Sequence, residues 1–149
     1  MIKLRRYSSH DIDEILQLFY DTVHNINIRD YTKRQVNAWA DGKTDKNIRN
    51  ASFAENYTIV AEQSGKIIGF GDIDSNGCID MLYVHKDFQG QGIASKICDI
   101  LEKGFSEITV HASITAKGFF ENRGYSVIKE QSVLRSGIFL TNFVMKKQS

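Results

Sequence analysis

Apolar residues recur at helical spacing in the first third of the chain. After a short strand-like opening at residues 2–7, Ser8 and Ser9 can cap a helix whose first turn is acidic, which suits the positive end of a helix. Its apolar stripe consists of Ile12, Ile15, Leu16, Phe19, Val23 and Ile26. Residues 32–40 predict a second short helix that ends near Gly42, and a weaker helical pattern continues to about residue 54.

From residue 57 the pattern changes to that of β-strands. Segments 57–62, 66–73 and 78–84 are rich in β-branched and other apolar residues. Ser64-Gly65 and Asn76-Gly77 separate them and are typical of tight hairpin turns. The pattern therefore predicts three consecutive antiparallel strands.

The second half of the chain alternates between the two periods. Residues 91–104 predict a helix, 108–111 a strand, and a further helix opens at Ser113 and is closed by Gly124. A final hairpin follows, with strands at 125–134 and 138–146. The order β-α-α-β-β-β-α-β-α-β-β predicts an α/β protein (α+β type) with a mixed sheet and helices on both faces, in a single domain over residues 1–149.

Composition narrows the class of protein. The 149 residues carry a formal net charge of +1, too weak to favour nucleic acid or an anionic membrane as the main partner. There is no apolar run long enough to span a membrane, and the first residues lack the apolar core of a signal peptide. Cys78 and Cys98 have no metal-ligand spacing, so we expect reduced thiols, no metal and a cytoplasmic protein.

The most informative segment is Gln89-Gly90-Gln91-Gly92-Ile93-Ala94, between a strand and a helix. Glycines let the backbone approach a ligand, and the open amides of a first helical turn bind anions. A flexible glycine turn without a ligand is the alternative. A dinucleotide fingerprint fails, because Ser95 stands at the third glycine position and the next strand ends in His111; the Gly-Lys of a P-loop is absent.

The loop matches the signature Gln/Arg-x-x-Gly-x-Gly/Ala at Gln89, Gly92 and Ala94. With the flanking elements, the chain resembles the GCN5-related N-acetyltransferase (GNAT) superfamily. Segments 31–39, 79–82, 111–117 and 141–143 resemble its YafP-like bacterial branch more narrowly. The resemblance implies a GNAT fold, in which splayed central strands form a wedge for coenzyme A, and an acyltransferase that uses acetyl-CoA.

The same resemblance implies a cofactor site made largely of main chain. Amides of the loop would hold the pyrophosphate, residues 82–84 would pair with the pantetheine, and an amide near Tyr83 would polarise the thioester carbonyl. A bulge in that strand would open the wedge. The expected cofactor-binding residues are Leu82, Tyr83, Val84, Gln89, Gly90, Gln91, Gly92, Ile93, Ala94, Ser95, Ser113 and Phe120.

An amine acceptor must lose a proton before it can attack. Asp80, a carboxylate in an apolar strand, is the first candidate base, and a structural carboxylate paired with a nearby Arg or Lys is the alternative. His111 is a second candidate, with a structural histidine as its alternative. Phe120 stands where many family members have a tyrosine that protonates the departing thiolate; the thiolate leaves unaided, or Tyr83 or Ser113 donates the proton.

The resemblance places the acceptor among His24, Tyr31, Gln35 and Trp39, although a solvated histidine and a core tryptophan are equally ordinary readings. The sequence thus predicts an N-acetyltransferase that acts on an amine of a small molecule or peptide by direct attack in a ternary complex. The alternative is a non-catalytic acyl-CoA-binding sensor of the same fold. Homodimers are common in the family.

Overall fold

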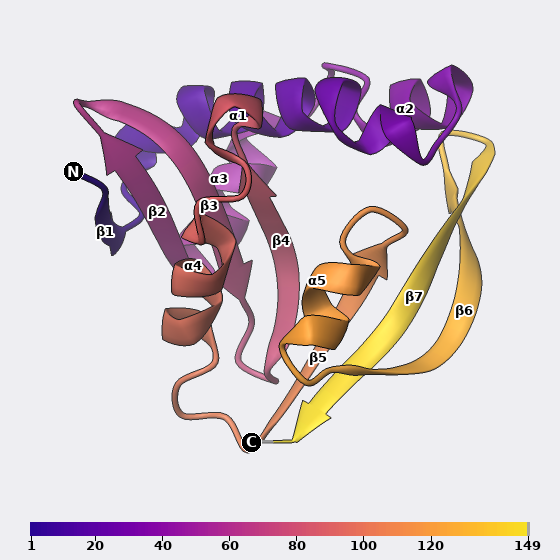
Figure 1. The fold of residues 1–149 in the computed structure, drawn as a ribbon. Coiled ribbons are helices and arrows are strands. Elements are labelled where there is room, and N and C mark those ends of the chain that lie inside the picture. Colours follow the sequence, from indigo (N-terminus) through magenta and orange to yellow (C-terminus); the bar gives the residue numbers. More distant parts are fainter. Residues whose placement is uncertain (149) are drawn as a thin grey trace.

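The computed structural model describes residues 1–148, which fold around one mixed sheet of seven strands (Figure 1). The spatial order of the strands is β1-β2-β3-β4-β5-β7-β6, and β4 and β5 form the parallel pair. The strands are β1 (Lys3–Arg6), β2 (Tyr57–Gln63), β3 (Lys66–Ile73), β4 (Cys78–Val84), β5 (Glu107–Ser113), β6 (Ser126–Arg135) and β7 (Ile138–Gln148).

Helices cover both faces of the sheet, as the alternating pattern predicts. They are α1 (Ile12–Asn25), α2 (Lys33–Trp39), α3 (Lys46–Glu55), α4 (Ile93–Leu101) and α5 (Lys117–Asn122), with 3-10 turns η1 (Ser9–Asp11), η2 (Asn27–Arg29) and η3 (Lys86–Phe88). In Figure 1, α4 and α5 lie in front of the sheet and α3 lies behind it. None of the helices within residues 1–148 has the length and apolarity needed to cross a membrane.

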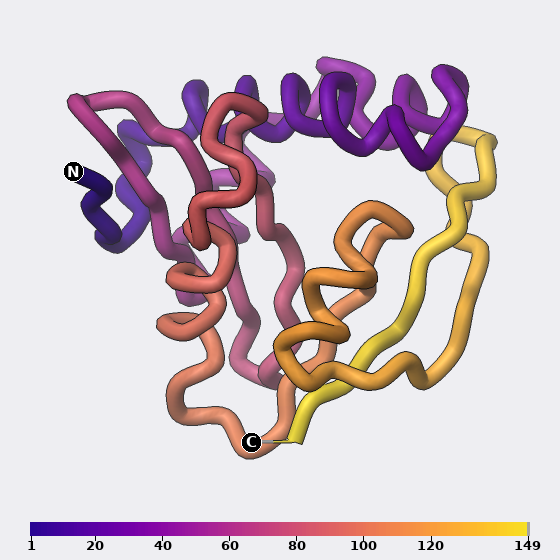
Figure 2. Tube along the Cα trace, viewed as in Figure 1, coloured from indigo at the N-terminus to yellow at the C-terminus, as the bar shows by residue number. Residues whose placement is uncertain are grey.

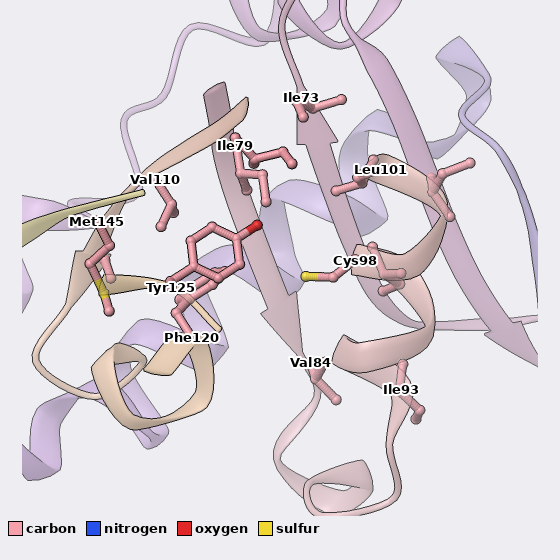
Figure 3. Close-up of a cluster of buried hydrophobic side chains, with 14 of the residues drawn as sticks. Ile73, Ile79, Val84, Ile93, Cys98, Leu101, Val110, Phe120, Tyr125 and Met145 are labelled. Atoms are coloured by element: carbon pink, nitrogen blue, oxygen red, sulfur yellow. The ribbon is translucent and has the colours of Figure 1, made fainter. Parts of the chain in front are cut away.

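Each face of the sheet has its own hydrophobic core. On one face, residues of α4 and α5 pack on the central strands, and Figure 3 shows Phe120 and Tyr125 next to Ile79 and Val110. On the other face, α1, α2 and α3 bury residues such as Ile15 and Phe53 against β2 and β3. Both cores use strand β4, so its side chains connect the two halves of the interior.

The predicted apolar stripe of α1 is largely confirmed. Ile12, Ile15, Phe19 and Val23 are buried, whereas Leu16 is half-buried and Leu18 takes a core position instead. The helix starts later than the serine pair suggests. Ser8 caps the short turn η1, where its amide donates to Asp11, and the α-helix begins at Ile12.

Two helix boundaries differ from the sequence prediction. The helix predicted over 91–104 is shorter, because Gly92 is its N-cap and it ends at Leu101. The helix predicted to open at Ser113 begins at Lys117. Ser113 instead pairs with Asn142 as the last residue of β5, and its Oγ accepts the Ala116 amide, which tightens the turn before α5. The weak helical pattern before residue 54 is a full helix, α3.

The central strands separate soon after they pair. β4 and β5 pair at only two positions, Cys78 with Thr109 and Ile79 with Val110, and Figure 2 shows their traces diverging beyond that point. The divergence begins where β4 contains a bulge: Asp72 pairs with Met81 and Ile73 with Ile79, which leaves Asp80 as the extra residue. A bulge bends the strand that carries it. The predicted splay is therefore confirmed.

Tyr31 connects the helical layer to the C-terminal half of the sheet. Its hydroxyl donates to the Thr141 carbonyl at 2.7 Å and accepts the Ile114 amide at 2.9 Å. The ring is buried and packs edge-on against Trp39. One side chain thus connects the residues before α2 to β7 and to the turn between β5 and α5.

Replacing Tyr31→Phe should lower the free energy of unfolding by about 1–3 kcal/mol, because the amide of Ile114 and the carbonyl of Thr141 each lose a buried partner. Urea denaturation of the variant and the wild type measures this difference. Tyr20→Phe is the matched control, since Tyr20 is exposed and its change should be close to neutral. Equal losses in the two variants would contradict the bridging role of Tyr31.

Candidate active site

A cleft opens where β4 and β5 separate, and it has two compartments. The first, of about 210 Å³, lies toward α4 and α5 and is called the helix compartment. The second, of about 180 Å³, lies toward the β6–β7 hairpin and is called the hairpin compartment. Six residues line both and form a shared wall: Trp39, Ile79, Asp80, Tyr83, His111 and Ser113. Four of the predicted catalytic or binding residues, Asp80 and Tyr83 on β4 and His111 and Ser113 on β5, thus meet at one place.

The glycine loop lies at the start of α4, as predicted. Gly90 and Gly92 have φ angles of 74° and 78°, the left-handed region that favours glycine. The positions that a Cβ would occupy at either glycine are open space, with no atom within 4 Å. The first amides of α4 have no acceptor inside the helix, so they offer donors at its positive end.

One edge of β4 faces the wedge. The Met81 amide donates to Asp72 on β3, and the His85 amide donates to the Ile68 carbonyl, so these odd-numbered amides face β3. Because alternate residues of a strand direct their polar groups to opposite edges, Leu82 and Val84 direct theirs toward the open side. The amide predicted near Tyr83 is therefore that of Leu82 or Val84, since the amide of Tyr83 itself faces β3.

The side chain of Gln89 makes a structural contact that the signature motif does not indicate. Its side-chain amide donates to the Val84 carbonyl and ties the glycine loop to the end of β4. Sequence reasoning assigned little to this side chain. The contact fixes the spacing between the helix N-terminus and the open strand edge.

The predicted cofactor residues fall into two groups. Seven line the helix compartment: Leu82, Tyr83, Val84, Gln89, Ala94, Ser113 and Phe120. The other five lie in the loop and the first turn of α4, outside its walls: Gly90, Gln91, Gly92, Ile93 and Ser95. The Ile93 side chain is buried in the core, and the Ser95 backbone carbonyl accepts a hydrogen bond from Arg123.

Buried side-chain oxygens without a partner gather in this cleft. Within residues 1–148 there are three such atoms: Thr22 Oγ1, Thr115 Oγ1 and Asn142 Oδ1. Thr22 and Thr115 line the helix compartment and Asn142 lines the hairpin compartment. Buried polar groups are normally hydrogen-bonded, so these three oxygens are candidate hydrogen-bond partners for ligands in the two compartments.

Asp80 is not buried, contrary to what its place in an apolar strand suggested. The bulge turns its side chain into the cleft, where it stays 50% exposed. Its Oδ2 lies 3.5 Å from the Arg49 guanidinium of α3, so the paired carboxylate that was the structural alternative is also present. The same carboxylate is accessible from both compartments.

The buried carboxylate is Asp72 on β3, which sequence reasoning missed. It is fully buried, and its Oδ1 accepts the Met81 amide at 2.9 Å while its Oδ2 accepts Asn56 Nδ2 at 3.0 Å. Met81 directly follows the bulge, so Asp72 holds the backbone that turns Asp80 into the cleft. Burial raises the pKa of Asp72 from 3.8 to about 6, with the negative charge of Asp80 adding to the effect.

Tyr83 and His111 face the junction from opposite strands. The Tyr83 ring packs against Phe19 and Phe70 at centroid distances of 5.1 and 5.8 Å. Burial raises the pKa of Tyr83, and the neighbouring Trp39 side chain opposes part of that rise. His111 is exposed within β5, two residues before the strand ends at Ser113.

The four predicted acceptor residues separate. Tyr31 and Trp39 line the hairpin compartment. Neither compartment includes His24 or Gln35. His24 Nε2 lies 2.7 Å from the Ala40 carbonyl and its ring stacks on Tyr20. The Gln35 side chain closes the capping box of α2 with Thr32 and donates to the Phe139 carbonyl, a structural role.

Within residues 1–148 no group of three or more His, Cys, Asp or Glu side chains could hold a metal ion. Both cysteines are free thiols, and Cys78 lies in the hairpin compartment. Burial raises the pKa of the Cys78 thiol, so this residue favours its neutral form.

Comparison with known proteins agrees with this geometry. A profile of the acetyltransferase (GNAT) domain family matches residues 27–147. The chain is 34% identical to the uncharacterized N-acetyltransferase YafP of Escherichia coli strain K12 over 97% of its own length and 95% of that protein. A GCN5-related N-acetyltransferase structure from Rhodopseudomonas palustris superposes with a TM-score of 0.94 at 32% identity, over 99% of this chain and 95% of that one.

A more distant structure shares the fold. The PaiA N-acetyltransferase of Thermoplasma acidophilum, solved in complex with coenzyme A, superposes with a TM-score of 0.78 at 16% identity. The superposition covers 100% of this chain and 99% of that one.

The raised pKa of Asp72 predicts a pH dependence of stability. An acid whose pKa rises on folding favours the folded state while protonated, so its contribution is lost as pH rises through the window from 3.8 to about 6. Asp72→Asn removes the ionisation. Across that window, the free energy of unfolding of the wild type should fall by about 3 kcal/mol relative to that of the variant. Urea unfolding of both proteins at pH steps measures the difference; parallel curves would contradict the prediction.

Proposed function

The chain belongs to the GNAT family of acetyltransferases, and we propose that it transfers the acetyl group of acetyl-CoA to an amine of a small molecule or peptide. The observation that carries the proposal is the splay of β4 and β5 beside the glycine loop, with two compartments that meet at Asp80, Tyr83 and His111. One compartment suits the acetyl donor and the other the acceptor.

The helix compartment and the adjoining glycine loop together fit coenzyme A on three counts. The open amides at the start of α4 suit a pyrophosphate, and the left-handed glycines leave room for it. The exposed edge of β4 at Leu82 and Val84 offers main-chain groups to an extended pantetheine arm. The unpaired hydroxyls of Thr22 and Thr115 supply further hydrogen-bonding groups in the same compartment.

When bound there, acetyl-CoA supplies an activated acetyl group as a thioester. The amide of Leu82 or Val84 is placed to donate to a carbonyl oxygen that lies in the wedge, which stabilises negative charge as it develops. Tyr83 adds a hydroxyl on the same strand, facing both compartments. These donors are fixed by the sheet, so they need no rearrangement during the reaction.

The acceptor amine must be neutral to attack, and a lysine-like amine has a pKa of about 10.4. We assign Asp80 as the first candidate to take its proton, directly or through a water molecule, since the carboxylate is accessible from both compartments. His111 on β5 is the second candidate. Because the two compartments share Asp80, Tyr83 and His111, we propose direct attack in a ternary complex without a covalent intermediate on the protein.

Residue 120 is a phenylalanine, so no tyrosine hydroxyl is present there to protonate the departing thiolate. Phe120 is 2% exposed and packs edge-on against Phe119 and Tyr125, so it forms the compartment wall and donates no proton. A thiol of ordinary pKa near about 8.5 can leave as the thiolate. Ser113 and Tyr83, both on the shared wall, carry the candidate hydroxyls for its protonation.

A non-catalytic acyl-CoA sensor is the alternative, and Phe120 is the feature that favours it. The second compartment argues for an enzyme, because a sensor has no need of an acceptor pocket that meets the donor pocket at a carboxylate and an imidazole. Both cysteine thiols are free, which supports a reducing, cytoplasmic location. Homodimer formation and independence from metals remain parts of the proposal.

Gly92→Ala tests the cofactor loop, and Gly104→Ala is its matched control. Both glycines flank α4, have positive φ angles of 78° and 87°, and have no atom within 4 Å of the place that a Cβ would take, so both changes impose a similar backbone strain. Only Gly92 lies at the proposed phosphate site. We expect Gly92→Ala to weaken coenzyme A binding at least about tenfold, because a lost charge-assisted hydrogen bond costs about 1.5–3 kcal/mol.

Isothermal titration of both variants with coenzyme A measures the effect. Gly104→Ala should bind like the wild type. Equal affinity in the two variants would remove the loop from the cofactor site, and the assignment of the helix compartment with it.

Asp80→Asn tests the base. If Asp80 takes the proton, kcat should fall by about 10²–10⁴-fold, the usual contribution of general base catalysis, with coenzyme A affinity unchanged. Thiol release from acetyl-CoA with a panel of amines measures turnover. Asp13→Asn is the control, because Asp13 also forms an exposed ion pair, with Lys46 at 2.9 Å, outside both compartments. Normal turnover in Asp80→Asn would move the role to His111.

A further inference from the structure

The hairpin compartment has charges of opposite sign on its lining. Asp80 and His111 lie on the wall that it shares with the helix compartment. Arg135, the last residue of β6, lines the hairpin compartment but not the helix compartment. A molecule in this space therefore meets the proposed proton acceptors on one side and the exposed Arg135 on another.

Arg135 has no acidic partner within residues 1–148. The one hydrogen bond of its guanidinium goes to the Leu134 carbonyl at 3.2 Å, in the neighbouring residue. The other arginine near the cleft, Arg49, is paired with Asp80, and the partly buried Arg123 pairs with Asp99 and Glu102. The guanidinium of Arg135 thus keeps most of its donors for a ligand, and its fork matches a carboxylate or phosphate.

The backbone that carries Arg135 is held in place. Arg135 pairs with Ile138 across a two-residue turn in which Ser136 and Gly137 have φ angles of 48° and 79°, the geometry of a tight hairpin. Two side chains fasten the hairpin to the helical layer: Tyr31 donates to the Thr141 carbonyl and Gln35 donates to the Phe139 carbonyl. The base of the Arg135 side chain is therefore fixed relative to Asp80.

The other residues that line the hairpin compartment indicate what else a ligand there would contact. Tyr31, Trp39 and Tyr83 supply aromatic surface, and the buried Asn142 Oδ1 is an acceptor without a donor. The compartment has a volume of about 180 Å³ and is enclosed by β4, β5, α2 and the β6–β7 hairpin. A small molecule with an N–H donor suits this space better than a folded protein surface.

Resting on the proposed acetyl transfer, we infer that the acceptor is a small amine that also carries an anionic group, and that Arg135 selects it. The amine lies toward Asp80 and His111, where its neutral nitrogen attacks the acetyl carbon. The C–N bond forms, the C–S bond breaks and coenzyme A leaves as the thiolate, while the proton lost by the nitrogen passes to the base. The carboxylate or phosphate of the same molecule pairs with Arg135. Arg135 is thereby a specificity-determining residue of the acceptor side.

Matched acceptors test the inference. Phenylalanine against phenylalaninamide varies a carboxylate, and O-phosphoethanolamine against ethanolamine varies a phosphate. In each pair, kcat/KM is measured for the wild type, Arg135→Gln, Arg135→Lys and Arg34→Gln. Arg34 is exposed on α2 and lines neither compartment, so Arg34→Gln makes the same change in net charge elsewhere.

The wild type should prefer the anionic member of at least one pair by tenfold or more, and the pair that shows the preference identifies the anion. Arg135→Gln should abolish that preference through a higher KM for the anionic amine, while Arg135→Lys keeps part of the preference and Arg34→Gln keeps all of it. Differences in amine pKa within a pair cancel when the ratio in each variant is divided by that of the wild type.

Two outcomes overturn the inference and separate it from the proposed function. If the wild type acetylates neutral and anionic amines equally, or if Arg135→Gln keeps the wild-type ratio, acetyl transfer stands and the role of Arg135 is lost. If no amine in the panel is acetylated although coenzyme A binds, the proposed enzyme and the inference both fail.

Discussion

The site depends on one hydrogen bond between neighbouring strands, from the Met81 amide to the buried carboxylate of Asp72. A bulge leaves backbone groups without their regular ladder partners, and here a side chain of β3 takes one of them. That contact fixes where the extra residue lies, so Asp80 faces the cleft and β4 turns away from β5 after two paired positions. The wedge for the donor and the placement of the candidate base thus have a common cause.

The donor side and the acceptor side of the cleft are built differently. Main-chain groups of the glycine loop and of β4 form the donor side, and a short local segment fixes them through two left-handed glycines and the Gln89 contact. The acceptor side is assembled from α2, β5 and the β6–β7 hairpin, which are far apart in the chain. Its geometry depends on long-range contacts such as Tyr31 with Thr141, which are 110 residues apart.

This difference explains what the sequence could and could not predict. The order of elements, the hairpin turns and the loop before α4 follow from local periodicity and glycine chemistry, and the structure confirms them except for the additional helix α3. Asp80 was expected to be buried and Asp72 was overlooked, because a bulge moves one side chain and not its neighbours, and periodicity does not reveal it. His24 and Gln35 have suitable side chains near the acceptor side, but tertiary hydrogen bonds occupy them.

In the proposed site, the donor side depends less on particular side chains than the acceptor side does. Main-chain recognition tolerates nearly any side chain, so a short signature is enough to mark a coenzyme A site in chains of low identity. The proposed acceptor side uses individual side chains such as Arg135, Asn142 and Trp39, on elements that are far apart in the chain. A fold held together by one wedge can therefore keep its chemistry while its acceptor changes, and the acceptor must be inferred from the charges and open hydrogen-bonding groups of this chain.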